Sequence, residues 1–135
     1  MLVALPAPAA NVSESSAPAM TSIRVRIGPK VFTARLYENP TATAFNALLP
    51  LTLKMSDLND SEKVIELREE LSGEVANPGT IQTGDLMIWS GRSLVLFYET
   101  FATPYRYAKL GRIEDVTGLA AAVGPGSVMV TFEMP

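Results

Sequence analysis

Short apolar runs recur along this chain between turn-forming residues, and they constrain its fold more than any other feature. Ile23, Val25 and Ile27 alternate with arginines, which is the pattern of a half-buried strand. A Gly-Pro-Lys turn follows, and residues 31–37 continue the pattern, so the two runs predict a β-hairpin. Residues 51–55 alternate in the same way and predict a third strand.

The second half of the chain contains further strand patterns. Two near-continuous apolar runs, residues 86–89 and 94–98, flank a Ser-Gly-Arg turn and predict a buried hairpin. Short strands are expected at residues 109–113 and 128–132. Residues 62–72 combine helix-forming residues with a Val-Ile-Glu-Leu run, so a helix and a strand both stay open there.

Two helices are expected between these strands. Asn39 followed by Pro40 is a typical helix start, and Pro50 marks the end of that segment. Residues 115–123 predict a second helix, closed by a Gly-Pro pair. Seven or eight strands with about two helices predict a mainly β protein, and a closed barrel would leave no strand edge exposed.

Composition excludes several kinds of chemistry. The 135 residues contain no His and no Cys, which removes thiolate nucleophiles, disulfides, the usual serine triad and structural zinc sites. The net charge is −3 with no basic block, so nothing favours nucleic acid as a partner. No apolar run approaches the roughly 18 residues that span a bilayer. We expect no metal and no cofactor.

Residues 1–20 differ from the rest because they are rich in Ala, Pro and Ser and carry one charge, at Glu14. We expect a disordered, dispensable tail, followed by a single domain at residues 21–135. Two alternatives stay open: a truncated secretory signal, or a start codon whose true position is Met20. The expected location is cytoplasmic, or exported if the tail is a signal.

Aromatic residues gather in the segment 97–107, around one proline. The candidate binding residues are Tyr98, Phe101, Tyr105 and Tyr107, at a strand end and in the following loop. Loop aromatics often line binding surfaces, and aromatic grooves hold extended or proline-containing peptides. The alternative is that they cover one end of the barrel. Phe97 and Trp89 are expected to be core residues.

Two arginines are candidate catalytic residues. Arg106 stands between two tyrosines, where its guanidinium could anchor a carboxylate or polarise a carbonyl. Arg112 is expected to form a surface ion pair with Glu99, Glu114 or Asp115.

Three further charged residues are candidates for the functional site. Glu62 and Lys63 are expected in a solvated turn, with the alternative that the pair faces the barrel mouth and Glu62 joins the binding site. Asp85 is expected to hydrogen-bond a turn rather than act as a base. The oxygen-rich loop at residues 56–62 lacks the spacing of an EF-hand, so we do not expect calcium there.

Several motifs carry a family resemblance. The stretch RLYENPTATAFNALLPLTLKM looks like the strand and first helix of cyclophilins. The motifs GDLMIW, LVLFYETF and LGRIED, together with LPLTLKMSDLNDSEKVIEL, resemble the small, mostly uncharacterised bacterial cyclophilin-like proteins. The resemblance implies a closed eight-stranded β-barrel. The Phe-His-Arg motif of the peptidyl-prolyl isomerases has no counterpart, and only Gly84-Asp85 matches their later Gly-Asp motif.

Three functions follow from these observations. The first is a binding module for a short peptide or small ligand, held by Tyr98, Phe101, Tyr105, Arg106, Tyr107 and Glu62. The second is a divergent peptidyl-prolyl isomerase that uses Arg106 or Arg112. The third is a structural or self-association module whose aromatic surface is a subunit interface. The oligomeric state, monomer or homodimer, stays open.

Overall fold

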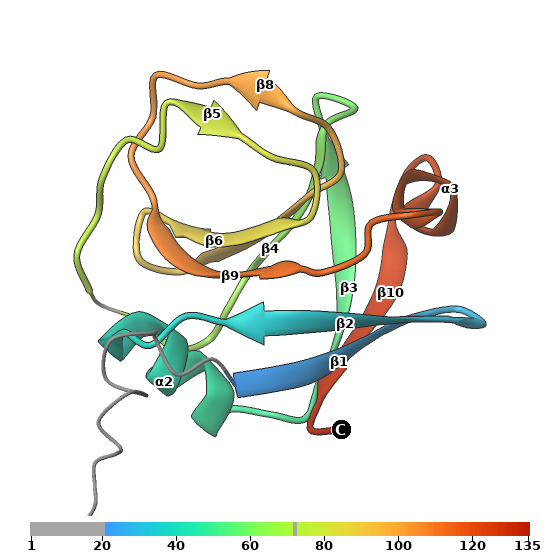
Figure 1. Ribbon diagram of the computed structural model, residues 1–135, viewed down its shortest axis with the longest axis horizontal. Coiled ribbons are helices and arrows are strands. Elements are labelled where there is room, and N and C mark those ends of the chain that lie inside the picture. The colour runs from blue at the N-terminus through green and yellow to red at the C-terminus, as the bar shows by residue number, and fades with distance from the viewer. Residues whose placement is uncertain (1–20, 72) are drawn as a thin grey trace, which may run out of the picture.

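Eight strands close into an antiparallel barrel in the order β1-β10-β3-β4-β7-β6-β9-β2 (Figure 1). This computed structural model describes residues 21–71 and 73–135. The barrel strands are β1 (Thr21–Ile27), β2 (Lys30–Leu36), β3 (Leu51–Leu58), β4 (Glu62–Glu66), β6 (Asp85–Trp89), β7 (Ser93–Phe97), β9 (Ala108–Ile113) and β10 (Val128–Glu133). The expected mainly β fold with a closed eight-stranded barrel is confirmed.

Side-chain alternation fills the barrel interior. In β1, Ile23, Val25 and Ile27 are at most 1% exposed, while the arginines between them face solvent. Val25 lies opposite Phe32 in the expected hairpin with β2. Because every second side chain of each barrel strand points inward, one continuous apolar core forms inside the barrel.

Helix α2 (Pro40–Ala47) begins where the sequence predicts and covers one end of this core. Asn39 caps the helix, because its side-chain oxygen accepts a hydrogen bond from the Ala42 amide at 2.7 Å. Phe45 is fully buried and packs edge-to-face on Phe132 of β10, with ring centroids 5.7 Å apart. The helix therefore contributes its apolar side to the barrel core.

Helix α3 (Leu119–Val123) is shorter than the sequence predicts. The expectation of a helix from residue 115 is wrong because two local features delay its start. The Asp115 carboxylate accepts a hydrogen bond from the Thr117 amide at 3.0 Å, which forms a turn. Gly118 then adopts a left-handed conformation with φ of 81°, which a continuing helix cannot include.

Residues 56–66 are mostly strand. β3 continues to Leu58, where the sequence predicts a loop, and residues 62–66 form strand β4, which is one of the two alternatives that the sequence leaves open. The prediction of a solvated turn at Glu62 and Lys63 is wrong, since Glu62 is 8% exposed and Lys63 is fully buried. The two side chains point to opposite faces of β4, and each face is covered by other parts of the protein.

A small sheet outside the barrel belongs to the segment that covers the outer face of β4. Strands β5 (Thr80–Ile81) and β8 (Phe101–Ala102) pair with each other above β6 and β9 (Figure 1). The sequence predicts neither strand, because two-residue strands have no detectable alternation. We call residues 73–84 and 98–107, which contain this sheet, the flap. A second apolar cluster joins the flap to the barrel: Ile81, Met87, Val95, Phe97 and Tyr107.

The predicted tail at residues 1–20 lies outside the described residues. Within residues 21–71 and 73–135, no helix has the length and apolar character needed to cross a bilayer.

Candidate functional site

A cavity of about 740 Å³ opens between the flap and the outer face of the barrel. The alternation of β7 defines that face: Leu94 and Leu96 belong to the interior core, whereas Val95 belongs to the outer cluster. Val64 of β4 lies opposite Val95 and shares its face. Both valines line the cavity, so its floor is the outer surface of two neighbouring barrel strands.

Four aromatic side chains line the cavity: Trp89, Phe101, Tyr105 and Tyr107. Phe101 and Tyr107 pack on the fully buried Phe97, with ring centroids 5.8 and 5.7 Å away. Tyr105 is 59% exposed at the rim. The structure thus brings three of the four predicted loop aromatics to one cavity, and Phe97 is the core residue that the sequence predicts.

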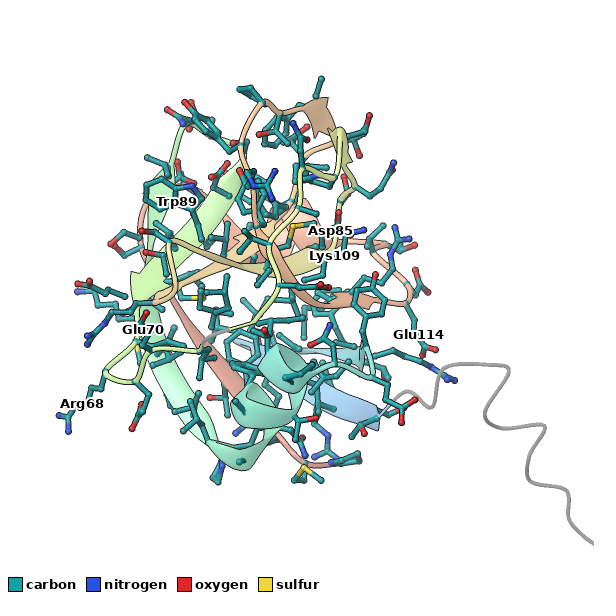
Figure 2. The ribbon with its side chains drawn as sticks, turned by 90° about the vertical axis from the view of Figure 1, so that its left-hand side faces the viewer. Arg68, Glu70, Asp85, Trp89, Lys109 and Glu114 are labelled. Atoms are coloured by element: carbon teal, nitrogen blue, oxygen red, sulfur yellow. The ribbon has the colours of Figure 1, made fainter. Side chains whose placement is uncertain are left out.

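Trp89 is not the core residue that its apolar neighbours suggest. It is 46% exposed and lies at the opposite end of β6 from Asp85, to the left of Asp85 and Lys109 in Figure 2. Met87, Ile88 and Trp89 alternate between the outer and inner faces of β6, and the outer cluster covers Met87 but ends before Trp89. Its place at the end of the strand therefore leaves the indole on the cavity wall.

The flap loop is held by its own hydrogen bonds. The Thr103 side chain accepts a hydrogen bond from the Tyr105 amide at 3.2 Å and lies 3.4 Å from the Tyr107 hydroxyl. On the other side, the Arg106 guanidinium donates to the Val75 carbonyl at 3.0 Å. The two Thr103 contacts are buried or half-buried and hold Tyr105 and Tyr107 at the cavity, whereas the Arg106 bond lies on the exposed side of the loop.

Glu62 places a carboxylate in the cavity wall. Its Oε1 accepts a hydrogen bond from the Ser61 hydroxyl at 2.5 Å. Burial raises the pKa of Glu62 above its usual value, and the nearby Asp57 charge raises it further against the opposing effect of the Ser61 bond. Among the described residues, no Lys or Arg forms an ion pair with Glu62.

Tyr98 is a predicted binding residue that does not line the cavity. Its hydroxyl donates to the Asp57 carboxylate at 2.5 Å, and its ring lies 5.4 Å from the Lys63 ammonium. The Lys63 Nζ is 3.0 Å from the same carboxylate oxygen and donates to the carbonyls of Gly124 and Gly126. Tyr98 therefore belongs to a polar cluster with the buried Lys63 and the half-buried Asp57.

The pKa values within this cluster shift in opposite directions. The hydrogen bond from Tyr98 lowers the pKa of Asp57, and the bond from Lys63 lowers it further. Burial raises the pKa of the Tyr98 hydroxyl well above its usual range, and the bond to Asp57 adds to this effect. The cluster thus holds an ionised carboxylate, a neutral phenol and a lysine that is surrounded by acceptors.

Neither candidate arginine lines the cavity. Arg106 is exposed and points to the Val75 carbonyl. Arg112 lies 3.8 Å from Asp85, so the expected pairing with Glu99, Glu114 or Asp115 is wrong. The alternation of β9 places Arg112 opposite the first residue of β6, and Glu114 pairs with Arg35 instead.

Asp85 has the turn role that the sequence predicts. Its Oδ2 accepts a hydrogen bond from the Gln82 amide at 2.8 Å. Burial raises the pKa of Asp85, and this effect exceeds the opposing ones of the Gln82 bond and of the Arg112 and Lys109 charges. In Figure 2, Asp85 and Lys109 lie close together.

Among the described residues, no cluster of three or more His, Cys, Asp or Glu side chains could hold a metal ion.

Comparison with known proteins gives the family. The sequence profile of the Cyclophilin-like family matches residues 25–133, which run from β1 to the last residue of β10. The chain belongs to the Cyclophilin-like family. This confirms the resemblance that the sequence motifs indicate. No curated protein matches this cyclophilin-like chain.

A solved structure shares the fold of this cyclophilin-like chain. It is the solution structure of a hypothetical protein from Archaeoglobus fulgidus, with a TM-score of 0.64 and 21% sequence identity. The similarity covers 87% of this chain and 97% of the archaeal one. At this identity the likeness concerns the fold alone. Since the neighbour is archaeal, the fold is not confined to the bacterial proteins to which the sequence points.

Proposed function

We propose that this protein is a binding domain that holds a short peptide or a small organic ligand in the cavity under the flap. The observation that carries this proposal is a cavity of about 740 Å³ with Trp89, Phe101, Tyr105 and Tyr107 in its walls. Ligand sites typically have volumes of roughly 300–1,000 Å³, with apolar and aromatic walls and few polar groups.

The exposure of the rim aromatics supports this use of the cavity. Trp89 and Tyr105 keep 46% and 59% of their surface in contact with solvent. Exposed aromatic surface is costly in water, and it is typical of binding sites when it gathers around one concavity. A ligand would remove part of this surface from water and would gain contacts with both side chains.

Shape distinguishes this proposal from the alternatives. Aromatics that line a cavity favour a ligand, whereas a self-association surface would present them as a flat patch. The divergent isomerase would need an arginine beside the bound proline, and the described lining contains neither Arg106 nor Arg112. The proposal therefore rests on the aromatic walls and requires no catalytic residue.

The experiment is a screen of fragments and short peptides against isotope-labelled protein by two-dimensional NMR. Trp89 is the only tryptophan, so quenching of its fluorescence reports events at the cavity directly. We expect the shifted signals to come from cavity residues. Tyr105→Ala should weaken binding, because it removes a wall of the cavity, while Arg106→Ala should leave affinity unchanged, because Arg106 points to Val75.

Two results would contradict the proposal. One is a screen in which no compound shifts the signals of the cavity residues. The other is a set of bound compounds whose affinity responds to Arg106→Ala but not to Tyr105→Ala, which would place the site elsewhere. A prolyl exchange measurement on the same peptide samples would detect isomerase activity directly.

A further inference from the structure

We propose that the ligand of this cavity is a small organic cation, a protonated amine on an apolar body, and that Glu62 is its counter-charge. This inference rests on the proposed function and names the chemistry of its ligand. It is carried by the charge of the lining, the burial of Glu62 and the aromatic faces around it.

The lining carries negative charge only. It contains two carboxylate side chains, Glu62 and Glu99, and no Lys or Arg. Lys63 is adjacent to Glu62 in sequence, but it points to the other face of β4, where Asp57 and two glycine carbonyls surround its ammonium group. An anionic ligand would therefore meet repulsion in this cavity, whereas a cation would meet attraction.

The Glu62 carboxylate is buried and has no cationic partner among the described residues. It is only 8% exposed, and within the described residues its one hydrogen bond comes from the Ser61 hydroxyl. A buried carboxylate without a positive partner is unfavourable, because desolvation penalises its charge. A bound ammonium group would supply the missing partner, and it would form a charge-assisted hydrogen bond in a partly dehydrated site.

The aromatic walls add a second attraction for positive charge. Faces of Trp and Tyr rings attract cations within about 6 Å through their quadrupoles. Trp89 and Tyr105 line the same cavity as Glu62, and the charge of Glu62 also acts on the Tyr107 hydroxyl, whose pKa is raised mainly by burial. A carboxylate among aromatic faces is thus suited to a cation that carries an apolar group.

The size of the cavity favours a free small molecule over a peptide side chain. Its volume of about 740 Å³ lies within the roughly 300–1,000 Å³ that enclose a drug-sized ligand. A lysine side chain alone would fill little of the aromatic wall. We therefore assign the cavity to a small amine, and binding of lysine in a peptide is tested as the alternative source of the same charge.

The experiment compares three ligands with the same phenylpropyl skeleton: phenylpropylamine, phenylpropanol and phenylpropanoate. Binding to the full-length protein is followed through Trp89 fluorescence and NMR shifts. We expect the amine to bind at least about tenfold more tightly than the alcohol, and the carboxylate to bind most weakly. Glu62→Gln should abolish the preference for the amine. It keeps an acceptor for Ser61, so the local fold should persist.

Glu66→Gln is the matched control. Glu66 is an exposed glutamate of the same strand and does not line the cavity, so the preference for the amine should survive its replacement. The two glutamine variants carry the same net charge. A loss of preference in Glu62→Gln alone would therefore exclude a general effect of charge.

The outcomes separate this inference from the proposed function. If the amine and the alcohol bind equally well in the cavity, the inference of a cationic ligand is wrong, while the proposed binding function stands. If none of the three ligands binds and the wider screen also fails, both the cationic ligand and the proposed binding function are wrong. If a lysine peptide binds more tightly than the amine and its norleucine counterpart does not bind, the cation stands and the small-molecule source is wrong.

Discussion

Glu62 and Lys63 are neighbours in β4, yet their side chains meet opposite surroundings. Lys63 is fully buried and has three acceptors for its ammonium group: the Asp57 carboxylate and the carbonyls of Gly124 and Gly126. Glu62 is nearly as buried and has one hydroxyl donor. The charge of Lys63 is therefore satisfied within the protein, while the charge of Glu62 is available to a ligand.

Lys63→Met should destabilise the protein by about 3 kcal/mol, since the half-buried Asp57 carboxylate would lose the cation that offsets its charge. The change also leaves two glycine carbonyls without their donor. Urea unfolding of the variant and the wild type measures the difference. Lys54→Met, an exposed lysine of β3, is the control and should change stability little. Equal stability of the two variants would show that the ammonium contacts contribute nothing.

Glu62→Gln should stabilise the protein at neutral pH. Burial raises the pKa of Glu62 in the folded state above its usual value of 4.5, so ionisation opposes folding. This cost is absent below the unfolded-state pKa and is complete once the pH has risen through the folded-state pKa. Unfolding measured from about pH 4 to about pH 8 should show the variant gaining on the wild type as the pH rises. A wild type that is more stable at neutral pH would contradict this.

Some of the site could be predicted from the sequence, and some could not. The density of aromatics at residues 97–107 indicates the groove, because loop aromatics need a reason to be exposed. The exposure of Trp89 and the burial of Glu62 depend on where the flap ends above the barrel, and that contact joins segments distant in sequence. No local pattern reports it.

At the scale of elements, β6 and β7 explain why the flap exists. Residues 86–88 and 94–97 are buried without alternation, so both faces of these strands are covered. The barrel interior covers one face, and the flap with its second apolar cluster covers the other. A near-continuous apolar run therefore indicates an outer layer, and this signal in the sequence could have predicted the flap.

Gly111→Ala tests how closely β9 must approach β2. A Cβ at this position would lie 2.1 Å from the Arg35 carbonyl oxygen and within 3 Å of other backbone atoms, so the two strands would have to separate. We expect a loss of about 2 kcal/mol or more. Lys109→Ala, an exposed residue of the same strand, is the control. Thermal unfolding of both variants measures the difference, and an unchanged midpoint in Gly111→Ala would show that the barrel adjusts freely.

For the whole molecule, closure comes from the strands at the two ends of the domain. β1 pairs with β10, and Glu133 of β10 lies 3.5 and 3.0 Å from Arg24 and Arg26 of β1. Periodicity predicts the strands and suggests a barrel, but the strand order depends on pairings between distant segments. The family resemblance supplied the eight-stranded architecture, because related motifs in the same order imply a related fold.

Hydrogen exchange should divide the molecule into two parts. The barrel amides take part in ladders that continue around a closed sheet, whereas β5 and β8 pair through two residues each. We therefore expect faster exchange at residues 80–81 and 101–102 than in β6 and β7. A cavity ligand should slow exchange in the flap and leave the barrel unchanged. Equal protection in both parts of the free protein would mean that flap and barrel open together.

The pairing of β1 with β10 has a consequence for how the chain can be cut and rejoined. Because the pair is antiparallel, Thr21 and Glu133 lie at the same edge of the barrel, away from the flap in Figure 1. A short linker could join these ends, and new termini could open at an exposed turn such as the one near Gly28. Such a circular permutant would keep every strand beside its present neighbours. The closed strand order therefore does not require β1 to be the first strand of the chain.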